Sequence, residues 1–314
     1  MESAPYHADI AGNPDGTCHW LTCVDGVRIR VGHWSFAQAK GTVLIFPGRT
    51  EYVEKYGRTA AELSKRGFAS VAIDWRGQGL ADRLLENRAV GHVDVFEDYQ
   101  LDIKAVLTHV KKLGLPEPYH LLGHSMGGCI GLRALYDGLA VRSVVFSAPM
   151  WGIRMSPALR PIAWGLSSVS KPLGFGGIFA PGQQAETYVL RTNADENTLT
   201  SDPSSFEILQ NQLITHPDLA LGGPSLHWLN ESLREMRTLS QRPSPDVPCL
   251  TFLGTEESIV DPVRINDRMA RWPGGELVLL EKGRHEVLME TKPLRDRVFD
   301  GATDLFNKHS PQMA

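Results

Sequence analysis

The chain has little of several features that would assign it to a specialised class of protein. Its 314 residues include only four cysteines, and Cys18, Cys23, Cys129 and Cys249 lack the spacing of metal ligands. No stretch approaches the ~18 uninterrupted apolar residues of a membrane span. Residues 1–16 have neither the basic nor the apolar segment of a signal peptide. These absences predict a reduced protein in the cytoplasm.

An excess of charge of one sign is also missing. The 32 basic and 36 acidic residues give a net charge of -4, and no basic tract stands out, which argues against nucleic acid as a partner. The hydrophobic share of 42% is that of an ordinary globular protein with a core. The length suits one large α/β domain, or such a domain carrying an insertion.

Short apolar runs alternate with helical patterns along most of the chain. The strands that we predict cover residues 19–24, 27–34, 42–46, 68–73, 119–122, 141–146, 249–253 and 276–280, and the helices cover 53–66, 96–113, 128–135, 263–272 and 293–308. The turn Asp25-Gly26 predicts a hairpin between the first two strands. The inner strands are apolar throughout, which predicts a mostly parallel sheet flanked by helices on both faces.

Residues 150–245 break this alternation. They are rich in Trp, Pro, Gly and Ser and contain helix-like pieces without strand-like ones. A long decorated loop is the alternative, but long loops without secondary structure are rare. We therefore predict a core formed by 1–149 and 246–314, with 150–245 inserted as a mainly helical cap.

The pentapeptide GHSMG at residues 123–127 is the strongest chemical signal. It follows a predicted strand and precedes a predicted helix, so Ser125 stands on a sharp elbow with its hydroxyl thrust out of the sheet. Gly123 and Gly127 lie where side chains would collide with the turn. The backbone N–H of Met126 is placed to receive a developing oxyanion.

Other polar groups follow the ends of further strands, where functional groups gather in a parallel sheet. The backbone N–H of Arg49 is the predicted second oxyanion donor, although residues 47–50 also fit a plain tight turn. His285 follows the last strand and is the predicted base. Three carboxylates at residues 256–261 follow the preceding strand, and one of them should orient His285. His124 points away from Ser125 by alternation along the chain.

These residue types fit nucleophilic catalysis. A serine hydroxyl is a poor nucleophile until an imidazole takes its proton, and a carboxylate holds the imidazole in the correct tautomer. The order of serine, acid and histidine along the chain is that of α/β-hydrolases. This chemistry needs no metal and no organic cofactor, and we predict none.

Several stretches together resemble the bacterial lysophospholipase and monoacylglycerol lipase branch of the α/β-hydrolase superfamily. They are the oxyanion loop at 46–56, the D-x-R-G-x-G turn at 74–79, the helix entry at 91–102, and the cap segments at 199–202 and 223–229. The resemblance spans about residues 25–300. It implies an α/β-hydrolase fold and an ester of a single acyl chain as the substrate.

One position departs from the pattern of this branch. Where the branch usually has Asp, the G-x-x-D position after the late strand holds Glu257. Glutamate also serves as the acid in such triads, so we predict Glu257 as the acid. Asp261 is the alternative, although the matching aspartate of the branch is more often structural.

Aromatic side chains suggest where an acyl chain would bind. We predict substrate contacts for Tyr52, Trp151, Trp164, Phe179 and Trp228, with the cap's own core as the alternative role of the cap residues among them. The cap also leaves open a transient, peripheral contact with a membrane surface. Residues 157–182 have only two basic residues to favour such contact.

The predicted function is therefore hydrolysis of carboxylic esters of single-chain acyl lipids, a lysophospholipid or a monoacylglycerol. An aminopeptidase is one alternative, for which Glu186, Asp195 and Glu196 would bind the substrate amine. A general hydrolase of small esters is another, and a non-catalytic ligand-binding member of the fold is a third. The oligomeric state is not predictable from the sequence.

Overall fold

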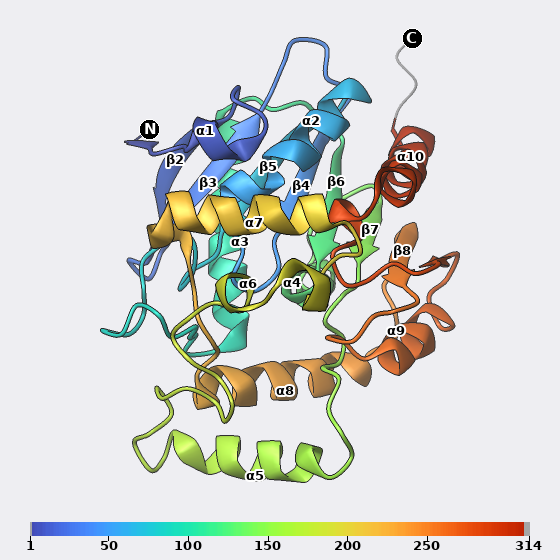
Figure 1. Ribbon diagram of the computed structural model, residues 1–314. Coiled ribbons are helices and arrows are strands. Elements are labelled where there is room, and N and C mark those ends of the chain that lie inside the picture. Colours follow the sequence, from blue (N-terminus) through green and yellow to red (C-terminus); the bar gives the residue numbers. More distant parts are fainter. Residues whose placement is uncertain (1, 311–314) are drawn as a thin grey trace.

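A single nine-stranded sheet forms the centre of the protein in the computed structural model, which describes residues 2–310 (Figure 1). The strand order is β1-β2-β3-β5-β4-β6-β7-β8-β9. The strands are β1 (Glu2–Ala4), β2 (Thr17–Thr22), β3 (Arg28–Trp34), β4 (Thr42–Phe46), β5 (Ala69–Asp74), β6 (Tyr119–His124), β7 (Val144–Ser147), β8 (Cys249–Gly254) and β9 (Glu276–Leu280). Strands β4 to β9 pair in parallel, and the first three strands pair antiparallel at one edge. The predicted mostly parallel sheet is confirmed.

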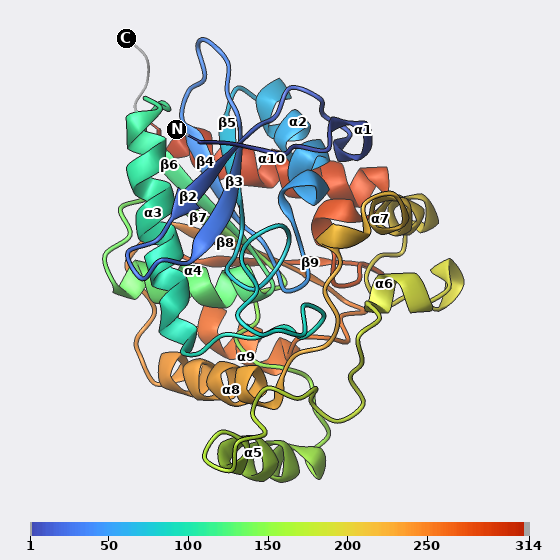
Figure 2. The ribbon, with the colours of Figure 1, turned by 90° about the vertical axis from the view of Figure 1, so that its left-hand side faces the viewer.

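Helices cover both faces of this sheet. The α-helices are α1 (Ala8–Ala11), α2 (Gly57–Lys65), α3 (Tyr99–Lys112), α4 (Met126–Tyr136), α5 (Leu159–Ser170), α6 (Tyr188–Arg191), α7 (Pro203–Thr215), α8 (Leu226–Ser240), α9 (Pro262–Met269) and α10 (Lys292–Lys308). Short 3₁₀-helices are η1 (Val53–Tyr56), η2 (Phe96–Asp98), η3 (Ala194–Glu196), η4 (Pro217–Leu219) and η5 (Val287–Met289). Figure 2 shows α3 and α4 on one side of the sheet and α2 and α10 on the other.

Strand β4 shows why the inner strands are apolar throughout. Val43 and Ile45 join the apolar cluster that includes residues of α2 and α10. Leu44 and Phe46 point to the opposite face and join the cluster that includes residues of α3, α4 and α9. Successive side chains of a strand alternate between the faces, so a strand covered on both sides has no position for a solvated residue.

The segment between β7 and β8 carries the helices of the predicted cap. Within the described residues, none of the nine strands falls between Ser147 and Cys249, whereas α5, α6, α7 and α8 all do. Helix α5 lies below α8 at the outer end of the molecule in both views (Figures 1 and 2). Asn230 of α8 donates hydrogen bonds of 3.1 and 3.0 Å to Ser167 and Ser168 of α5. The cap is therefore mainly helical, and its separation from the core as a domain stays a prediction.

Two short elements near the N-terminus were not predicted. Strand β1 pairs with β2 over three residues, and α1 follows it. Elements of three or four residues are too short to produce a periodic pattern. All four cysteines are unpaired and buried. Over the described range, no helix has the length and apolar character needed to cross a bilayer.

Candidate active site

Ser125 occupies a strained position between β6 and α4. Its φ of 48° and ψ of -117° are unusual for a residue with a side chain. A Cβ atom at Gly127 would collide with the backbone carbonyl of Phe46, so the elbow can sit against the end of β4 only with glycine there. This local geometry lifts the Ser125 hydroxyl above the carboxyl end of the sheet.

The structure brings Ser125, His285 and Glu257 into one line of hydrogen bonds. The Ser125 Oγ lies 3.0 Å from His285 Nε2, and His285 Nδ1 lies 2.7 Å from Glu257 Oε2. Ser125 and His285 are 160 positions apart in the sequence, and they meet because both follow carboxyl ends of parallel strands. All three side chains are almost fully buried.

The carboxylate of Glu257 is held as an anion. Its second oxygen, Oε1, accepts hydrogen bonds from the backbone N–H groups of Ile259 at 2.6 Å and Val260 at 3.1 Å. Burial on its own would raise the pKa of Glu257. The interaction with His285 and the two backbone donors outweigh burial, so the pKa is lowered. A carboxylate in this state can orient an imidazole and stabilise its cation.

Asp261, the alternative acid, has another position and partner. It is the N-cap of α9 and accepts a hydrogen bond of 3.0 Å from the backbone N–H of Val263. Its other oxygen lies 3.5 Å from the guanidinium of Arg160. The structure does not bring Asp261 to His285, because the chain turns after Glu257 to begin α9.

The two predicted oxyanion donors have free N–H groups. In residues 2–310 the backbone N–H of Arg49 and that of Met126 have no hydrogen-bond partner, whereas the N–H of Gly48 donates to the carboxylate of Glu51. Thr50 donates at 3.3 Å to Gln78 Oε1. The donors on either side of Arg49 are thus occupied, and the N–H groups of Arg49 and Met126 remain available to an incoming oxygen.

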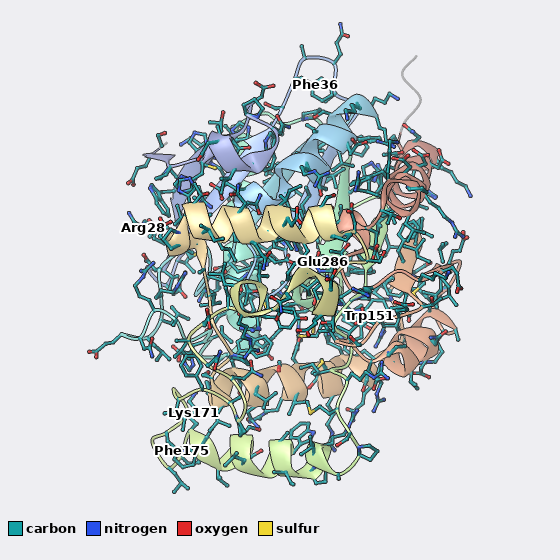
Figure 3. The ribbon with its side chains drawn as sticks, viewed as in Figure 1. Arg28, Phe36, Trp151, Lys171, Phe175 and Glu286 are labelled. Carbon is teal, nitrogen blue, oxygen red and sulfur yellow. The ribbon has the colours of Figure 1, made fainter. Side chains whose placement is uncertain are left out.

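A buried cluster of charged side chains lies beside the three residues, and the sequence analysis did not find it. Lys55 Nζ donates to Glu51 and lies 2.6 Å from Glu286 Oε1. His124 Nε2 lies 3.4 Å from Glu51 and 3.3 Å from Glu286, while its Nδ1 lies 2.9 Å from Ser147 Oγ. Figure 3 shows Glu286 near the centre of the molecule.

The pKa values of His124 and Glu286 shift in opposite directions because each group stabilises the charged form of the other. Burial alone would lower the pKa of His124, but Glu286 and Glu51 outweigh it and the pKa is raised. Burial alone would raise the pKa of Glu286, but His124 and Lys55 hold it well below its ordinary value. Glu51, His124 and Glu286 lie close enough together to hold a metal ion. The ammonium group of Lys55 already supplies a cation to both carboxylates.

Two cavities meet at Ser125. The first has a volume of about 280 Å³ and a mixed lining that includes Tyr52, Lys55, Glu186, Tyr188, Arg191, Leu199, Leu209 and His285. The second has a volume of about 470 Å³ and a largely apolar lining that includes Met150, Ile153, Leu159, Ile162, Ala163, Leu166, Leu226, Trp228 and Leu229. Arg49, Ser125, Gln183 and Ile259 belong to both. The site can therefore hold a molecule with an apolar part and a polar part on opposite sides of its reacting bond.

The predicted substrate contacts divide into two groups. Tyr52 lines the first cavity and donates a hydrogen bond of 2.9 Å to Gln212 Oε1, and Trp228 lines the second. Trp151, Trp164 and Phe179 line neither. Trp151 lies near α9 (Figure 3). Its ring stacks on that of Trp272, with ring centroids 6.1 Å apart. A substrate contact for these three aromatic residues stays a prediction, because they do not line the two cavities at Ser125.

Together, the sheet, the serine elbow and the hydrogen-bonded line define a serine hydrolase of the α/β-hydrolase fold. Residues 37–292 match the family model described as "Serine aminopeptidase, S33", and the chain belongs to this family.

Similarity to known proteins extends over nearly the whole chain. The chain is 28% identical over 303 residues to Lysophospholipase L2 of Escherichia coli K12, covering 92% of this chain and 87% of that protein. It is 24% identical over 307 residues to Monoglyceride lipase of Saccharomyces cerevisiae, covering 91% and 92%. The crystal structure of a soluble variant of that yeast lipase with a substrate analogue is similar with a TM-score of 0.72 at 22% identity, covering 93% of this chain and 95% of that one.

Proposed function

We propose that the protein hydrolyses carboxylic esters of single-chain acyl lipids, either lysophospholipids or monoacylglycerols, through an acyl-enzyme. The observation that carries this proposal is the position of Ser125 where an apolar cavity of about 470 Å³ meets a more polar one of about 280 Å³. One acyl chain would fill the apolar cavity, and the head group would occupy the other. The names of the relatives, Lysophospholipase L2 and Monoglyceride lipase, support the same substrate class.

The mechanism assigns one role to each group. The Ser125 oxygen attacks the ester carbonyl carbon while His285 Nε2 takes the hydroxyl proton. Glu257 stabilises the imidazolium through Nδ1, and the N–H groups of Arg49 and Met126 bind the oxyanion. The carbon–oxygen bond to the alcohol breaks, and His285 returns the proton to the leaving oxygen. Water, activated by His285, then attacks the acyl-enzyme and releases the fatty acid.

An aminopeptidase remains the second candidate because of the family to which the chain belongs. Such an enzyme needs carboxylates that bind the substrate amine near the serine. Of the three acidic residues considered for this role, Glu186 lines the first cavity, and Asp195 and Glu196 line neither. Glu186 is itself exposed, which weakens its interaction with an amine. The geometry therefore favours the ester.

We further propose that the cap touches lipid surfaces through α5 and the loop after it. Leu159, Ile162 and Leu173 are 58%, 61% and 68% exposed. Residues 152–185 include Arg154, Arg160 and Lys171 but neither Asp nor Glu. Leu159 and Ile162 also line the apolar cavity, so a lipid could enter it from the surface on which the cap rests.

Sedimentation with anionic vesicles tests the contact with lipid. Wild-type protein should sediment with vesicles that contain phosphatidylserine, and Leu173→Asp should remain in the supernatant. Ile214→Asp is the matched control, because Ile214 is 69% exposed on α7 rather than on α5. Equal sedimentation of all three proteins would contradict the contact through α5 and the loop after it, in which Leu173 lies.

A substrate panel tests the enzymatic proposal. Wild type and Ser125→Ala would be assayed with oleoyl lysophosphatidylcholine, monooleoylglycerol, p-nitrophenyl butyrate and aminoacyl anilides. We expect the wild type to turn over the lipid esters most efficiently and Ser125→Ala to lose this activity. Turnover of the anilides in preference to the lipid esters would identify an aminopeptidase instead. Preference for the butyrate would identify a hydrolase of small esters, and no turnover of any ester would leave a ligand-binding role.

A further inference from the structure

The side chain of Arg49 forms part of the wall between the two cavities. Its Nη1 donates a hydrogen bond of 2.9 Å to the backbone carbonyl of Gly222, and its guanidinium carbon lies 5.6 Å from the centre of the Trp228 ring. A Cβ atom at Gly91 would lie 3.0 Å from Nη1. The guanidinium is therefore packed against Gly222 and Trp228 of the cap and against Gly91.

This guanidinium has no anionic partner in the protein. Across residues 2–310, no carboxylate lies within ion-pair distance of Arg49, and its other side-chain N–H groups make no hydrogen bond. Burial lowers the pKa of Arg49 to about 10, so the group still carries its charge at neutral pH. A half-buried cation without a counter-ion is costly, and such a group is usually paired.

The other charges near the first cavity do not compensate Arg49. Glu51 and Glu286 are engaged by Lys55 and His124. At the rim, the opposite charges of Glu186 and Arg191 are both exposed. Among the described residues that line the second cavity, Arg49 is the one with a charged side chain. The guanidinium of Arg49 is therefore a positive charge without a counter-ion at the place where the two cavities meet.

We propose that Arg49 binds the phosphate of a lysophospholipid head group and thereby makes the enzyme prefer lysophospholipids to neutral monoacylglycerols. This inference rests on the proposed ester hydrolysis at Ser125. The backbone N–H of Arg49 would contact the oxyanion at the ester carbonyl, and its side chain would reach the phosphate at the far end of the glycerol unit. A guanidinium matches the geometry of phosphate oxygens.

The contacts of Arg49 with Gly222 and Trp228 suit the binding of a phosphate. The hydrogen bond to Gly222 occupies one terminal nitrogen and leaves the other nitrogens for two phosphate oxygens. The apolar wall at Trp228 lowers the local dielectric and strengthens the attraction between the ions. A neutral glycerol head group would leave the charge of Arg49 uncompensated, whereas a phosphodiester would neutralise it.

Hydrolysis of two esters with the same acyl chain tests this selectivity. The kcat/KM values of oleoyl lysophosphatidylcholine and monooleoylglycerol would be measured for wild type, Arg49→Met, Arg49→Lys and Arg191→Met. We expect the ratio of the two values to fall roughly 10- to 100-fold in Arg49→Met, as for a lost hydrogen bond to a charged group. Arg49→Lys should recover part of this ratio, and Arg191→Met should change it far less because Arg191 is exposed. A ratio in Arg49→Met equal to that of the wild type would overturn the proposal.

Binding to a protein that cannot turn over substrate separates this inference from the proposed function. In a Ser125→Ala background, calorimetry would compare a short-chain ether lysophosphatidylcholine with the matching alkylglycerol. An Arg49-dependent preference for the phospholipid would support the inference even if the wild type hydrolysed neither ester. Equal affinity for the two lipids would overturn it. Inorganic phosphate that binds as tightly as the ether lipid would also overturn it, because the site would then bind free phosphate rather than a head group.

Discussion

Glu286 and Lys55 are 231 positions apart in the sequence, yet Glu286 Oε1 lies 2.6 Å from Lys55 Nζ in a buried ion pair. Glu286 directly follows His285, and Lys55 also donates to Glu51, which holds the N–H of Gly48 next to Arg49. The pair therefore ties the loop of the base to the oxyanion loop.

Removal of the cation should destabilise the protein and disturb the site. Lys55→Met leaves Glu51 and Glu286 buried without Lys55, and we expect the free energy of unfolding to fall by about 3–5 kcal/mol. In protein that remains folded, kcat should fall more than KM rises, because substrate contacts remain while the catalytic loops shift. Urea unfolding and steady-state kinetics measure the two effects. Lys55→Arg retains the charge and should lose less of both, and equal losses in the two variants would contradict the account.

Glu257 and Asp261 should respond differently to substitution. Glu257→Gln keeps the volume of the side chain but removes the charge that stabilises the His285 imidazolium, so kcat should fall by roughly 10³–10⁴-fold. Asp261→Ala removes the N-cap of α9 and should lower the free energy of unfolding by about 1 kcal/mol, with little change in kcat. Steady-state kinetics and urea unfolding of the two variants check this. A larger loss of kcat in Asp261→Ala would make Asp261 the acid.

The second cavity should determine the preferred acyl length. Ala163 lines it from α5, and Ala163→Phe would fill part of the space that a long acyl chain occupies. Exclusion of two methylene groups should lower kcat/KM for an oleoyl ester roughly tenfold relative to a butyryl ester. Leu199→Phe, in the first cavity, is the matched control and should leave this ratio near that of the wild type. A ratio unchanged in Ala163→Phe would exclude the second cavity as the acyl site.

Stability at mildly acidic pH should depend on His109. This residue is buried on α3, and burial and the neighbouring His19 and His33 lower its pKa to about 4. Between its ordinary value of 6.5 and about 4, the unfolded chain binds a proton that the native protein does not, so stability falls as the pH falls through this range. In His109→Gln, the loss of unfolding free energy between pH 7 and pH 5 should be smaller by about 2 kcal/mol. An equal loss in wild type and variant would contradict this.

The sheet and the three hydrogen-bonded residues Ser125, His285 and Glu257 could be predicted from the sequence, because each depends on a local pattern. The apolar run of β6, the two glycines of the elbow and the start of α4 together mark Ser125 within a few residues. His285 and Glu257 each follow a strand, and the parallel order of β6 to β9 brings those ends to one edge. The sequence favours Glu257 over Asp261 because Glu257 occupies the G-x-x-D position of the related branch and glutamate also serves as the acid in such triads.

The buried cluster of charged side chains could not be predicted from the sequence. Its members come from the loop between β4 and η1, from η1, from the end of β6 and from the loop after β9, and no spacing along the chain relates them. The alternation along β6 predicts that the His124 ring points away from Ser125, but it does not reveal that Glu51 and Glu286 lie beside this ring.

The aromatic residues of the cap do not all lie at the cavities that meet at Ser125. Trp151 and Trp164 are of a residue type expected in an acyl-binding site, but the same residue type is also common in protein cores. Trp151 packs on Phe146 and Trp272 at the junction with the sheet. Aliphatic residues such as Ile153, Leu166 and Leu229 line the apolar cavity together with Trp228, and no pattern in the sequence singles the aliphatic residues out.

The most direct test of the account is the detection of the acyl-enzyme. Wild-type protein and Ser125→Ala would be mixed with oleoyl lysophosphatidylcholine or monooleoylglycerol, quenched in acid within one turnover, digested and analysed by mass spectrometry. The account predicts a peptide containing Ser125 that is heavier by one oleoyl group in the wild type, and no acylated peptide in Ser125→Ala. Ester hydrolysis at an undiminished rate in Ser125→Ala, or an oleoyl group on another residue, would contradict it.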